Sequence, residues 1–441
     1  MKLAGWGNFP RMGCRTAEIR QAEDARRWIA EAPLVARGNG RSYGDASLQP
    51  NLTLLMRRMD CLRAFDPATG LLTCEAGVSL ETILDIFLPR GWLPPVTPGT
   101  KFVTVGGMIA SDVHGKNHHH IGSFGRHVRS LSLLLADGRV VECGPAQHPE
   151  LFAATLGGMG LTGVILAATF PLVPVRSAFI RQEVVRAPSL DAALDAFEAS
   201  AGWTYSVAWI DCLTGGRHLG RCLLSRGELA EPDDLPPALR AVPLVRKTRA
   251  AHRVPVDLPH WVLNRWSMRA FNTLYYNKSP RRPEPGIVDL DGFFYPLDAL
   301  LEWNRIYGRA GFTQYQCVLP KQAGRQGMRQ LLATIQKSGF GSFLAVLKLF
   351  GGGDVGLLSF PLEGYTLALD FPVRPPTLSL LHELDAIVAG HGGRLYLAKD
   401  ARSTPDMLRK GYPDLAEFQA VRAQWGAVGR LQSLLAERLH L

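Results

Sequence analysis

The stretch Val35-Ala36-Arg37-Gly38-Asn39-Gly40-Arg41-Ser42-Tyr43-Gly44-Asp45 passes from a short apolar strand directly into a glycine-rich turn. Glycine has no Cβ and tolerates positive φ, so main-chain N–H groups in such a turn can approach an anion closely. The spacing G-x-G-x-x-x-G differs from the G-x-G-x-x-G of a nicotinamide-binding turn, and no helical pattern follows it. The stretch therefore predicts a phosphate cradle that is not the nicotinamide fingerprint.

Two further glycine-rich segments follow, at residues 98–117 and 157–165. A tight turn explains one such segment, but three in succession need a common cause. A long diphosphate-bearing cofactor, held against the main chain at three points, supplies that cause. The three segments together predict that the N-terminal part of the chain binds a cofactor.

Length and composition are those of a globular protein with two domains. The chain has 441 residues, of which 46% are hydrophobic and 20% charged. No apolar run approaches the roughly 18 residues that span a bilayer. Residues 1–14 lack the apolar stretch of a signal peptide. These features predict a cytoplasmic protein.

The seven cysteines are scattered, odd in number and never spaced C-x-x-C. This pattern argues against a disulfide framework and against a zinc ribbon. We expect buried free thiols in a reducing compartment.

The net charge of +10 is concentrated in residues 235–282, which hold ten lysines and arginines and one acid, Asp257. Trp261, Trp266, Phe271, Tyr275 and Tyr276 are interleaved with these basic residues. Such a mixture suits a nucleic acid, an anionic membrane surface or a lipid phosphate, and it also suits a solvated loop that only keeps the protein soluble.

The predicted elements change in character along the chain. Residues 1–177 alternate short strands and helices, whereas residues 178–392 contain several alternating strands and few helices. We expect strands at 311–319, 342–350, 356–359 and 365–371, which favours an antiparallel sheet with helices on one face. Residues 393–441 are expected to form loops and helices.

The glycine-rich segments resemble the FAD-binding domain of the vanillyl-alcohol oxidase/p-cresol methylhydroxylase superfamily. Within it, the resemblance is to the family of decaprenylphosphoryl-β-D-ribose 2′-oxidases, and it covers nearly the whole chain. The residues that carry it are 37–45, 105–107, 114–119, 122–125, 302–305, 314–316, 348–351 and 392–400. It implies an α+β, two-domain fold of the PCMH type, with an FAD-binding domain at 1–177 completed by 393–441. The substrate domain, built on an antiparallel sheet, would span 178–392 and carry a basic, mobile segment at 235–282.

The resemblance also assigns residues to FAD. Those implied to bind the cofactor are Arg37, Gly38, Asn39, Gly40, Arg41, Ser42, Tyr43, Gly99, Thr104, Val105, Gly106, Gly107, Ser111, Asp112, His114, Ile165 and Tyr396. Many members of the superfamily attach FAD to a histidine where this chain has Arg41. Arginine cannot form that bond, and no cysteine lies between Cys74 and Cys143, so we expect non-covalent FAD.

The implied chemistry moves a hydride from a carbinol carbon to the flavin while the hydroxyl proton goes to a base or to water. Negative charge then builds on the flavin, where a cation stabilises it. Lys399 and Lys116 are the candidate cations, and His114 is expected to lie against the flavin. A buried lysine could equally be the base, because burial lowers its pKa, and the sequence does not separate these two roles.

Five residues of the second domain match substrate-binding positions of the family: Gln314, Gln316, Lys348, Phe350 and Trp209. Alternate residues such as Gln314 and Gln316 lie on one face of a strand, as a binding wall requires. The chain departs from mycobacterial members at Ala368, where they carry cysteine, and at Thr366, where they carry asparagine. Both departures bear on the choice of substrate.

The run His118-His119-His120 invites a metal-binding interpretation. Adjacent residues of an extended chain point to opposite faces, so the three rings should diverge. We therefore expect no metal site.

Three functions follow from these features. The first is oxidation of a sugar secondary alcohol, the 2′-hydroxyl of a polyprenylphosphoryl-β-D-ribose, with a short-chain NAD(P)H-dependent reductase as partner and contact with the inner membrane surface. The second is a soluble aldonolactone or sugar-alcohol oxidase. The third is a nucleic-acid-binding protein that uses the basic segment, an account that leaves the glycine-rich segments without a role, so we expect no nucleic-acid partner.

Overall fold

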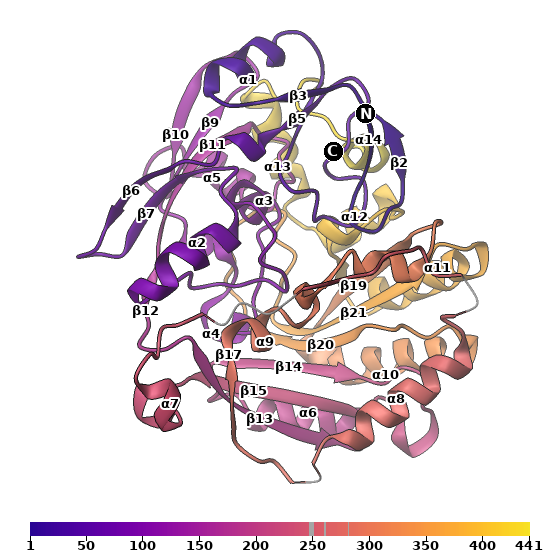
Figure 1. Cartoon of the computed structure of the whole chain (residues 1–441). Helices are drawn as coiled ribbons and strands as arrows, with labels where there is room; N and C mark the ends of the chain where they lie inside the picture. The colour runs from indigo at the N-terminus through magenta and orange to yellow at the C-terminus, as the bar shows by residue number, and fades with distance from the viewer. Residues whose placement is uncertain (247–250, 260–261, 281) are drawn as a thin grey trace.

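The computed structural model describes residues 1–246, 251–259, 262–280 and 282–441 (Figure 1). Of the basic and aromatic residues counted in the segment 235–282, Lys247, Arg249, Trp261 and Arg281 lie outside these ranges. Among the described residues, no helix combines the length and apolar character needed to cross a bilayer.

The first part of the chain is built on two small sheets, drawn in indigo and purple in Figure 1. A parallel sheet has the order β3-β5-β4, and an antiparallel sheet has the order β10-β9-β11-β7-β6. Their strands are β3 (Thr16–Glu18), β4 (Val35–Arg37), β5 (Thr53–Leu55), β6 (Leu62–Asp66), β7 (Leu71–Glu75), β9 (Ser130–Leu134), β10 (Val140–Cys143) and β11 (Val164–Pro171). The helices of this part are α1 (Ala22–Ile29), α2 (Leu80–Phe87), α3 (Val105–Ala110), α4 (His118–Ile121) and α5 (Pro149–Thr155).

The second part is an eight-stranded antiparallel sheet of order β17-β13-β15-β14-β20-β21-β19-β22. Its strands are β13 (Phe179–Ala187), β14 (Tyr205–Ile210), β15 (Cys222–Leu229), β17 (Gly286–Asp289), β19 (Phe312–Pro320), β20 (Ala345–Phe350), β21 (Gly364–Pro372) and β22 (Arg394–Leu395). Helices α6 (Leu190–Ala199), α10 (Lys321–Ser338) and α11 (Pro375–Gly390) pack on one face around a common apolar core. The predicted α+β fold with an antiparallel sheet is confirmed.

Two-residue alternation decides what the sheet presents on each face. On β19, Tyr315 and Cys317 enter the core beneath the helices, whereas Gln314 and Gln316 point to the opposite face. That face turns toward the first part of the chain. The strand expected at 356–359 is wrong: these residues form a turn, from which the Ser359 hydroxyl donates a hydrogen bond to Asp112.

Short elements complete the chain. They are β1 (Lys2–Ala4), β2 (Arg11–Gly13), β8 (Trp92–Leu93), β12 (Val173–Pro174), α7 (Pro237–Arg240), β16 (His252–Arg253), α8 (Arg265–Lys278), α9 (Leu290–Phe294), η6 (Pro296–Ala299), β18 (Leu300–Leu301), η8 (Leu397–Lys399), α12 (Pro405–Gly411), α13 (Leu415–Gln424) and α14 (Leu434–Leu439).

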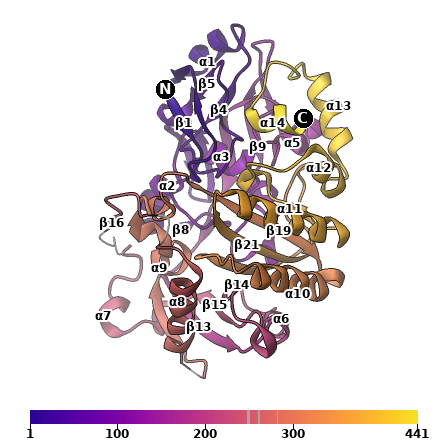
Figure 2. The same ribbon diagram turned by 90° about the vertical axis from the view of Figure 1, so that its right-hand side faces the viewer.

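The C-terminal segment returns to the first part of the chain. Figure 2 shows α13 and α14 beside α5, and their apolar side chains share one core with Val318 and Phe350 of the eight-stranded sheet. The fully buried Arg422 fastens this segment, since its guanidinium donates to the carbonyls of Leu161 at 2.9 Å and of Leu431 at 2.7 Å. The end of the chain therefore completes the first part.

Replacing Arg422 should weaken the whole fold. Arg422→Ala leaves two buried carbonyls without donors and opens a void, so we expect the free energy of unfolding to fall by about 3 kcal/mol. Urea unfolding followed by circular dichroism measures it. Arg409→Ala, at a side chain that is 61% exposed, is the control and should change it by less than about 0.5 kcal/mol. An unchanged value for Arg422→Ala would contradict this role.

Candidate active site

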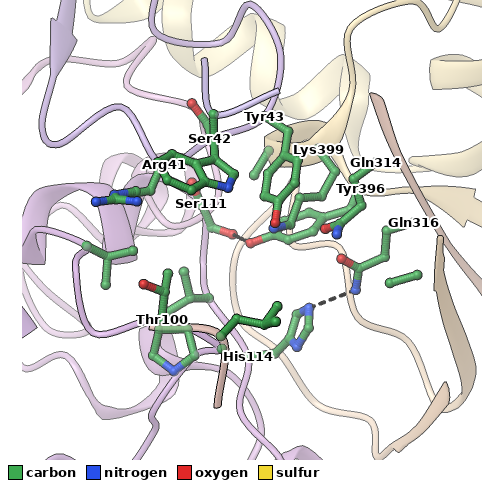
Figure 3. A pocket seen from close by; sticks show the side chains of 18 of the residues that line it. Arg41, Ser42, Tyr43, Thr100, Ser111, His114, Gln314, Gln316, Tyr396 and Lys399 are labelled. Carbon is green, nitrogen blue, oxygen red and sulfur yellow. Dashed lines mark hydrogen bonds between the residues drawn. The ribbon is translucent and has the colours of Figure 1, made fainter. Parts of the chain in front are cut away.

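A cavity of about 680 Å³ lies between the first part of the chain and the open face of the eight-stranded sheet. One wall is made by the three glycine-rich segments, and the other by β13, β14, β15, β19, β20 and β21. Segments far apart in the sequence therefore share one site. Figure 3 shows residues from both walls converging on it.

Most of the residues singled out from the sequence line this cavity. They are Gly38, Asn39, Gly40, Arg41, Ser42, Tyr43, Gly99, Thr104, Gly106, Gly107, Ser111, His114, Lys116, Ile165, Trp209, Gln314, Gln316, Lys348, Tyr396 and Lys399. Arg37, Val105, Asp112 and Phe350 do not line it, although each packs just behind a residue that does.

Arg37 supports the first glycine turn from behind. Its guanidinium donates to Ser47 Oγ at 2.9 Å and to the carbonyl of Ala4 at 2.6 Å. A Cβ at Gly40, where φ is +63°, would lie 2.1 Å from Arg37 Nη2. A Cβ at Gly38 would lie 2.1 Å from Thr104 Oγ1. These glycines are required because the turn is packed against its own neighbours.

Asp112 joins two loops behind the site. Its carboxylate accepts from the Gly125 N–H at 2.8 Å and from the Ser359 hydroxyl, and burial raises its pKa to about 7. Val105 is fully buried in the core of the first part. Phe350 lies edge-on to His114, with ring centroids 4.6 Å apart.

The cavity fits a long ligand that has both polar and aromatic parts. A Cβ at Gly99 or Gly160 would meet no atom within 4 Å, so the main chain there borders open space. Within the described residues, the buried atoms Arg41 Nε and His114 Nδ1 have no hydrogen-bond partner. Buried polar atoms are normally paired, so these two await an acceptor from a ligand. The Arg41 guanidinium itself lies 4.2 Å from the Trp6 ring centroid.

His114 is held as a neutral ring. Burial lowers its pKa well below the usual value, and the positive charge of Lys348 lowers it further. The Gln316 amide donates to His114 Nε2 at 3.1 Å, so Nε2 is the acceptor and the proton resides on Nδ1. The Tyr396 side chain, which also lines the cavity, donates a hydrogen bond from its hydroxyl to the Ser111 carbonyl at 2.7 Å (Figure 3).

Three lysines that line the cavity are half-buried. Burial lowers the pKa of Lys399 to about 7, that of Lys116 to about 7 and that of Lys348 to about 8. Lys399 Nζ lies 3.8 Å from the centroid of the Tyr43 ring. Lys116 donates to the Phe293 carbonyl. Such a concentration of ammonium groups favours an anionic ligand.

Two carboxylates that the sequence did not single out belong to this electrostatic system. Asp370 pairs with Gln314 across β21 and β19, accepts from its amide at 2.7 Å and raises the pKa of Lys399. Asp298 lines the cavity and accepts from the Lys101 N–H at 2.8 Å. The alternation of side chains along β21 predicts that Asp370 lies on the cavity side of the sheet. Its pairing with Gln314 depends on the register of β21 against β19, which the sequence does not give.

The histidine run forms one turn of helix, α4, so the expectation of an extended chain is wrong. His118 pairs with Asp354 at 2.9 Å, whereas His119 and His120 both contact the Trp203 carbonyl at 3.0 Å. Among the described residues, no three metal-ligating side chains gather at one point.

The site and fold are those of an FAD-binding oxidoreductase. Residues 15–144 match the family model described as FAD binding domain. The chain is 41% identical, over its full length and 97% of the relative, to decaprenylphosphoryl-beta-D-ribose oxidase of Mycolicibacterium smegmatis. It is 36% identical over 82% of its length to an uncharacterized protein of Streptomyces coelicolor, all of which is covered. D-arabinono-1,4-lactone oxidase of Yarrowia lipolytica is 26% identical over 34% of this chain and 29% of its own.

The chain belongs to the decaprenylphosphoryl-beta-D-ribose oxidase family. It is an FAD-dependent enzyme, as the family resemblance of its glycine-rich segments implied.

Filling the space beside Gly99 should exclude FAD. Gly99→Val places a side chain where a Cβ meets open cavity, so we expect the FAD content to fall by about tenfold or more. The flavin released into the supernatant by acid, per mole of protein, measures it. Gly13→Val is the control, because its Cβ also meets no atom within 4 Å but lies outside the cavity. Equal FAD content in the two variants would contradict the assignment.

Proposed function

We propose that the enzyme oxidises the 2′-hydroxyl of a polyprenylphosphoryl-β-D-ribose to the 2′-keto sugar. The observation that carries this proposal is the group of three half-buried lysines, Lys116, Lys348 and Lys399, whose side chains line one cavity. A sugar phosphate compensates their charge, whereas a neutral lactone leaves it unpaired. The relative that this chain matches over its own full length is named for a substrate of this kind.

FAD, when bound, supplies a two-electron acceptor for the hydride of the carbinol carbon. We assign its binding to the residues of the glycine-rich segments that line the cavity, with Arg41 directing its unpaired Nε–H to an acceptor. No histidine stands at position 41, and no cysteine is among the described residues that line the cavity, which supports non-covalent binding.

The protein's own groups position the sugar and manage charge. Gln316 fixes the His114 ring so that Nδ1–H is a donor near the reacting centre. Lys399, whose positive charge is favoured by Asp370, would stabilise the negative charge that a bound flavin gains with the hydride. The hydroxyl proton passes to water or to a neutral lysine. Gln314, Lys348 and Trp209 complete the substrate wall.

The product chemistry implies a partner. A 2′-keto sugar becomes the arabinose epimer only when a reductase returns a hydride to the opposite face, so a short-chain NAD(P)H-dependent reductase would follow this enzyme. A lipid substrate also places the enzyme at the inner membrane surface. Trp266 of α8, 74% exposed beside Arg265 and Arg269, supports such contact.

We also propose the division into an FAD-binding domain at 1–177, completed by 393–441, and a substrate domain at 178–392. The sheet order supports it, since β13 begins the eight-stranded sheet at Phe179. Within the segment at 235–282, Arg246 pairs with Asp291 at 3.0 Å and also with Asp85. This part of the segment is therefore held by ion pairs.

Substrate preference separates the two enzymatic functions. With an artificial electron acceptor, we expect kcat/KM for polyprenylphosphoryl ribose to exceed that for D-arabinono-1,4-lactone by about 100-fold or more, because only the first substrate carries a phosphate for the lysines. Steady-state turnover in detergent measures both. Faster turnover of the lactone would favour the aldonolactone oxidase and contradict the proposal.

The pH dependence tests the role of Lys399. The carboxylate of Asp370 raises the pKa of Lys399, so Asp370→Asn should lower it. If the reaction needs the charged lysine, activity falls above the pKa of Lys399. In Asp370→Asn, the alkaline limb of the profile of kcat/KM against pH should then move to lower pH by about one pH unit. Movement of the acid limb instead would make the neutral lysine the base. Asp406→Asn, on the surface, is the control, and an unmoved profile for Asp370→Asn would contradict both roles.

A further inference from the structure

A row of side chains crosses the open face of the sheet from the catalytic end of the cavity to its outer edge. The strand register places Gln316 beside Ala368, Ala368 beside Val346, Val346 beside Trp209, and Trp209 beside Leu223. All five residues line the cavity. Four steps of about 4.8 Å between strands make a track about 19 Å long.

The polarity of the track changes along its length. At its inner end Gln316 bonds His114, and Lys348 lies two residues beyond Val346 on the same face of β20. Beyond Val346 the row contains Trp209 and Leu223. Val184 and Val207 line the same wall, which also carries the uncharged polar residues Gln182 and Ser225 and, within the part of the chain that the structure describes, no cationic residue. A cationic inner end that continues into an apolar outer end matches an amphiphile with an anionic head.

Helix α8 closes the outer end of this track. Its Tyr275 ring lies 4.9 Å from that of Trp209, and Phe271 stacks on Tyr275 at 5.7 Å and also contacts Phe343 at 5.3 Å. Phe271, Tyr275 and Phe343 all line the cavity. Yet Phe271 and Tyr275 are 39% and 43% exposed, so their apolar area is incompletely covered by the protein.

The position of α8 is fixed by polar contacts on its other side. Asn272, buried, donates to Asp211 Oδ1 at 2.8 Å, and Arg221 donates to Thr273 Oγ1 at 3.2 Å. Tyr276 donates to the Ala187 carbonyl at 3.3 Å. The aromatic pair is therefore presented by an anchored helix.

Building on the proposed function, we propose that this track, capped by Phe271 and Tyr275 of α8, binds the first isoprene units of the polyprenyl chain. The aliphatic chain would leave the phosphate at the lysines, pass over Val346 and Trp209, and emerge beneath α8. These residues make the enzyme selective for a prenyl phosphate over a soluble sugar phosphate.

Chain-length dependence tests the inference. In the FAD-loaded enzyme, farnesyl phosphate should perturb the flavin spectrum with a Kd at least about tenfold below that of methyl phosphate, because apolar contact adds to the shared phosphate interaction. Tyr275→Ala should raise the Kd of farnesyl phosphate by about tenfold, and that of methyl phosphate by less than about twofold. Val346→Thr, which keeps the shape of the side chain, should act in the same direction.

The matched control is Leu274→Ala on the same helix, at a side chain that is 73% exposed and outside the cavity. It should leave both Kd values unchanged. The inference is overturned if farnesyl and methyl phosphate bind alike, if Tyr275→Ala weakens both equally, or if Leu274→Ala matches Tyr275→Ala. Binding is measured without turnover, so the two proposals can fail separately. If chain length affects binding but the enzyme does not oxidise polyprenylphosphoryl ribose, only the proposed function is contradicted.

Discussion

The partial burial of three ammonium groups side by side is the constraint on which this active site depends. Lys116, Lys348 and Lys399 line one cavity, and burial lowers the pKa of each. Asp370 is the acid that raises the pKa of Lys399, and it is itself fixed by Gln314 and Tyr307. Buried positive charge destabilises a protein unless an anion compensates it. The cavity therefore favours a ligand that carries negative charge, because such a ligand compensates the positive charge of the lysines.

The two parts of the fold hold the residues of the cavity in different ways. The first part presents glycine-rich main chain, with Arg37 and Thr104 packed so closely against Gly40 and Gly38 that side chains cannot be accommodated. The sheet of the second part presents alternate side chains on a rigid face, so Gln316 can fix His114 across the cavity. The C-terminal segment then joins both parts, since β22 pairs with β19 before α13 and α14 pack on the first part.

The glycine turns are local signals and predicted a diphosphate-bearing cofactor, whereas FAD itself and most of the residues that line the cavity were implied by the resemblance to the family. Arg37 and Asp112 were expected to bind FAD, but they lie behind the cavity and support its wall. Both belong to the glycine-rich segments, and the sequence does not show that their side chains point away from the cavity. Asp370 was missed since its pairing with Gln314 depends on the register of β19 and β21. The helical turn at His118 was missed because Gly115 favoured an extended chain, whereas the pair of His118 with Asp354 is a long-range contact.

The most direct test of the account follows the hydride. Polyprenylphosphoryl ribose carrying deuterium at the 2′ carbon is mixed anaerobically with the FAD-loaded enzyme, and the flavin absorbance at about 450 nm is recorded. The account predicts that the flavin is bleached and that the oxidised sugar, analysed by mass spectrometry, has lost its deuterium. A flavin that stays oxidised in stoichiometrically loaded enzyme, or a product that keeps the label, would contradict it.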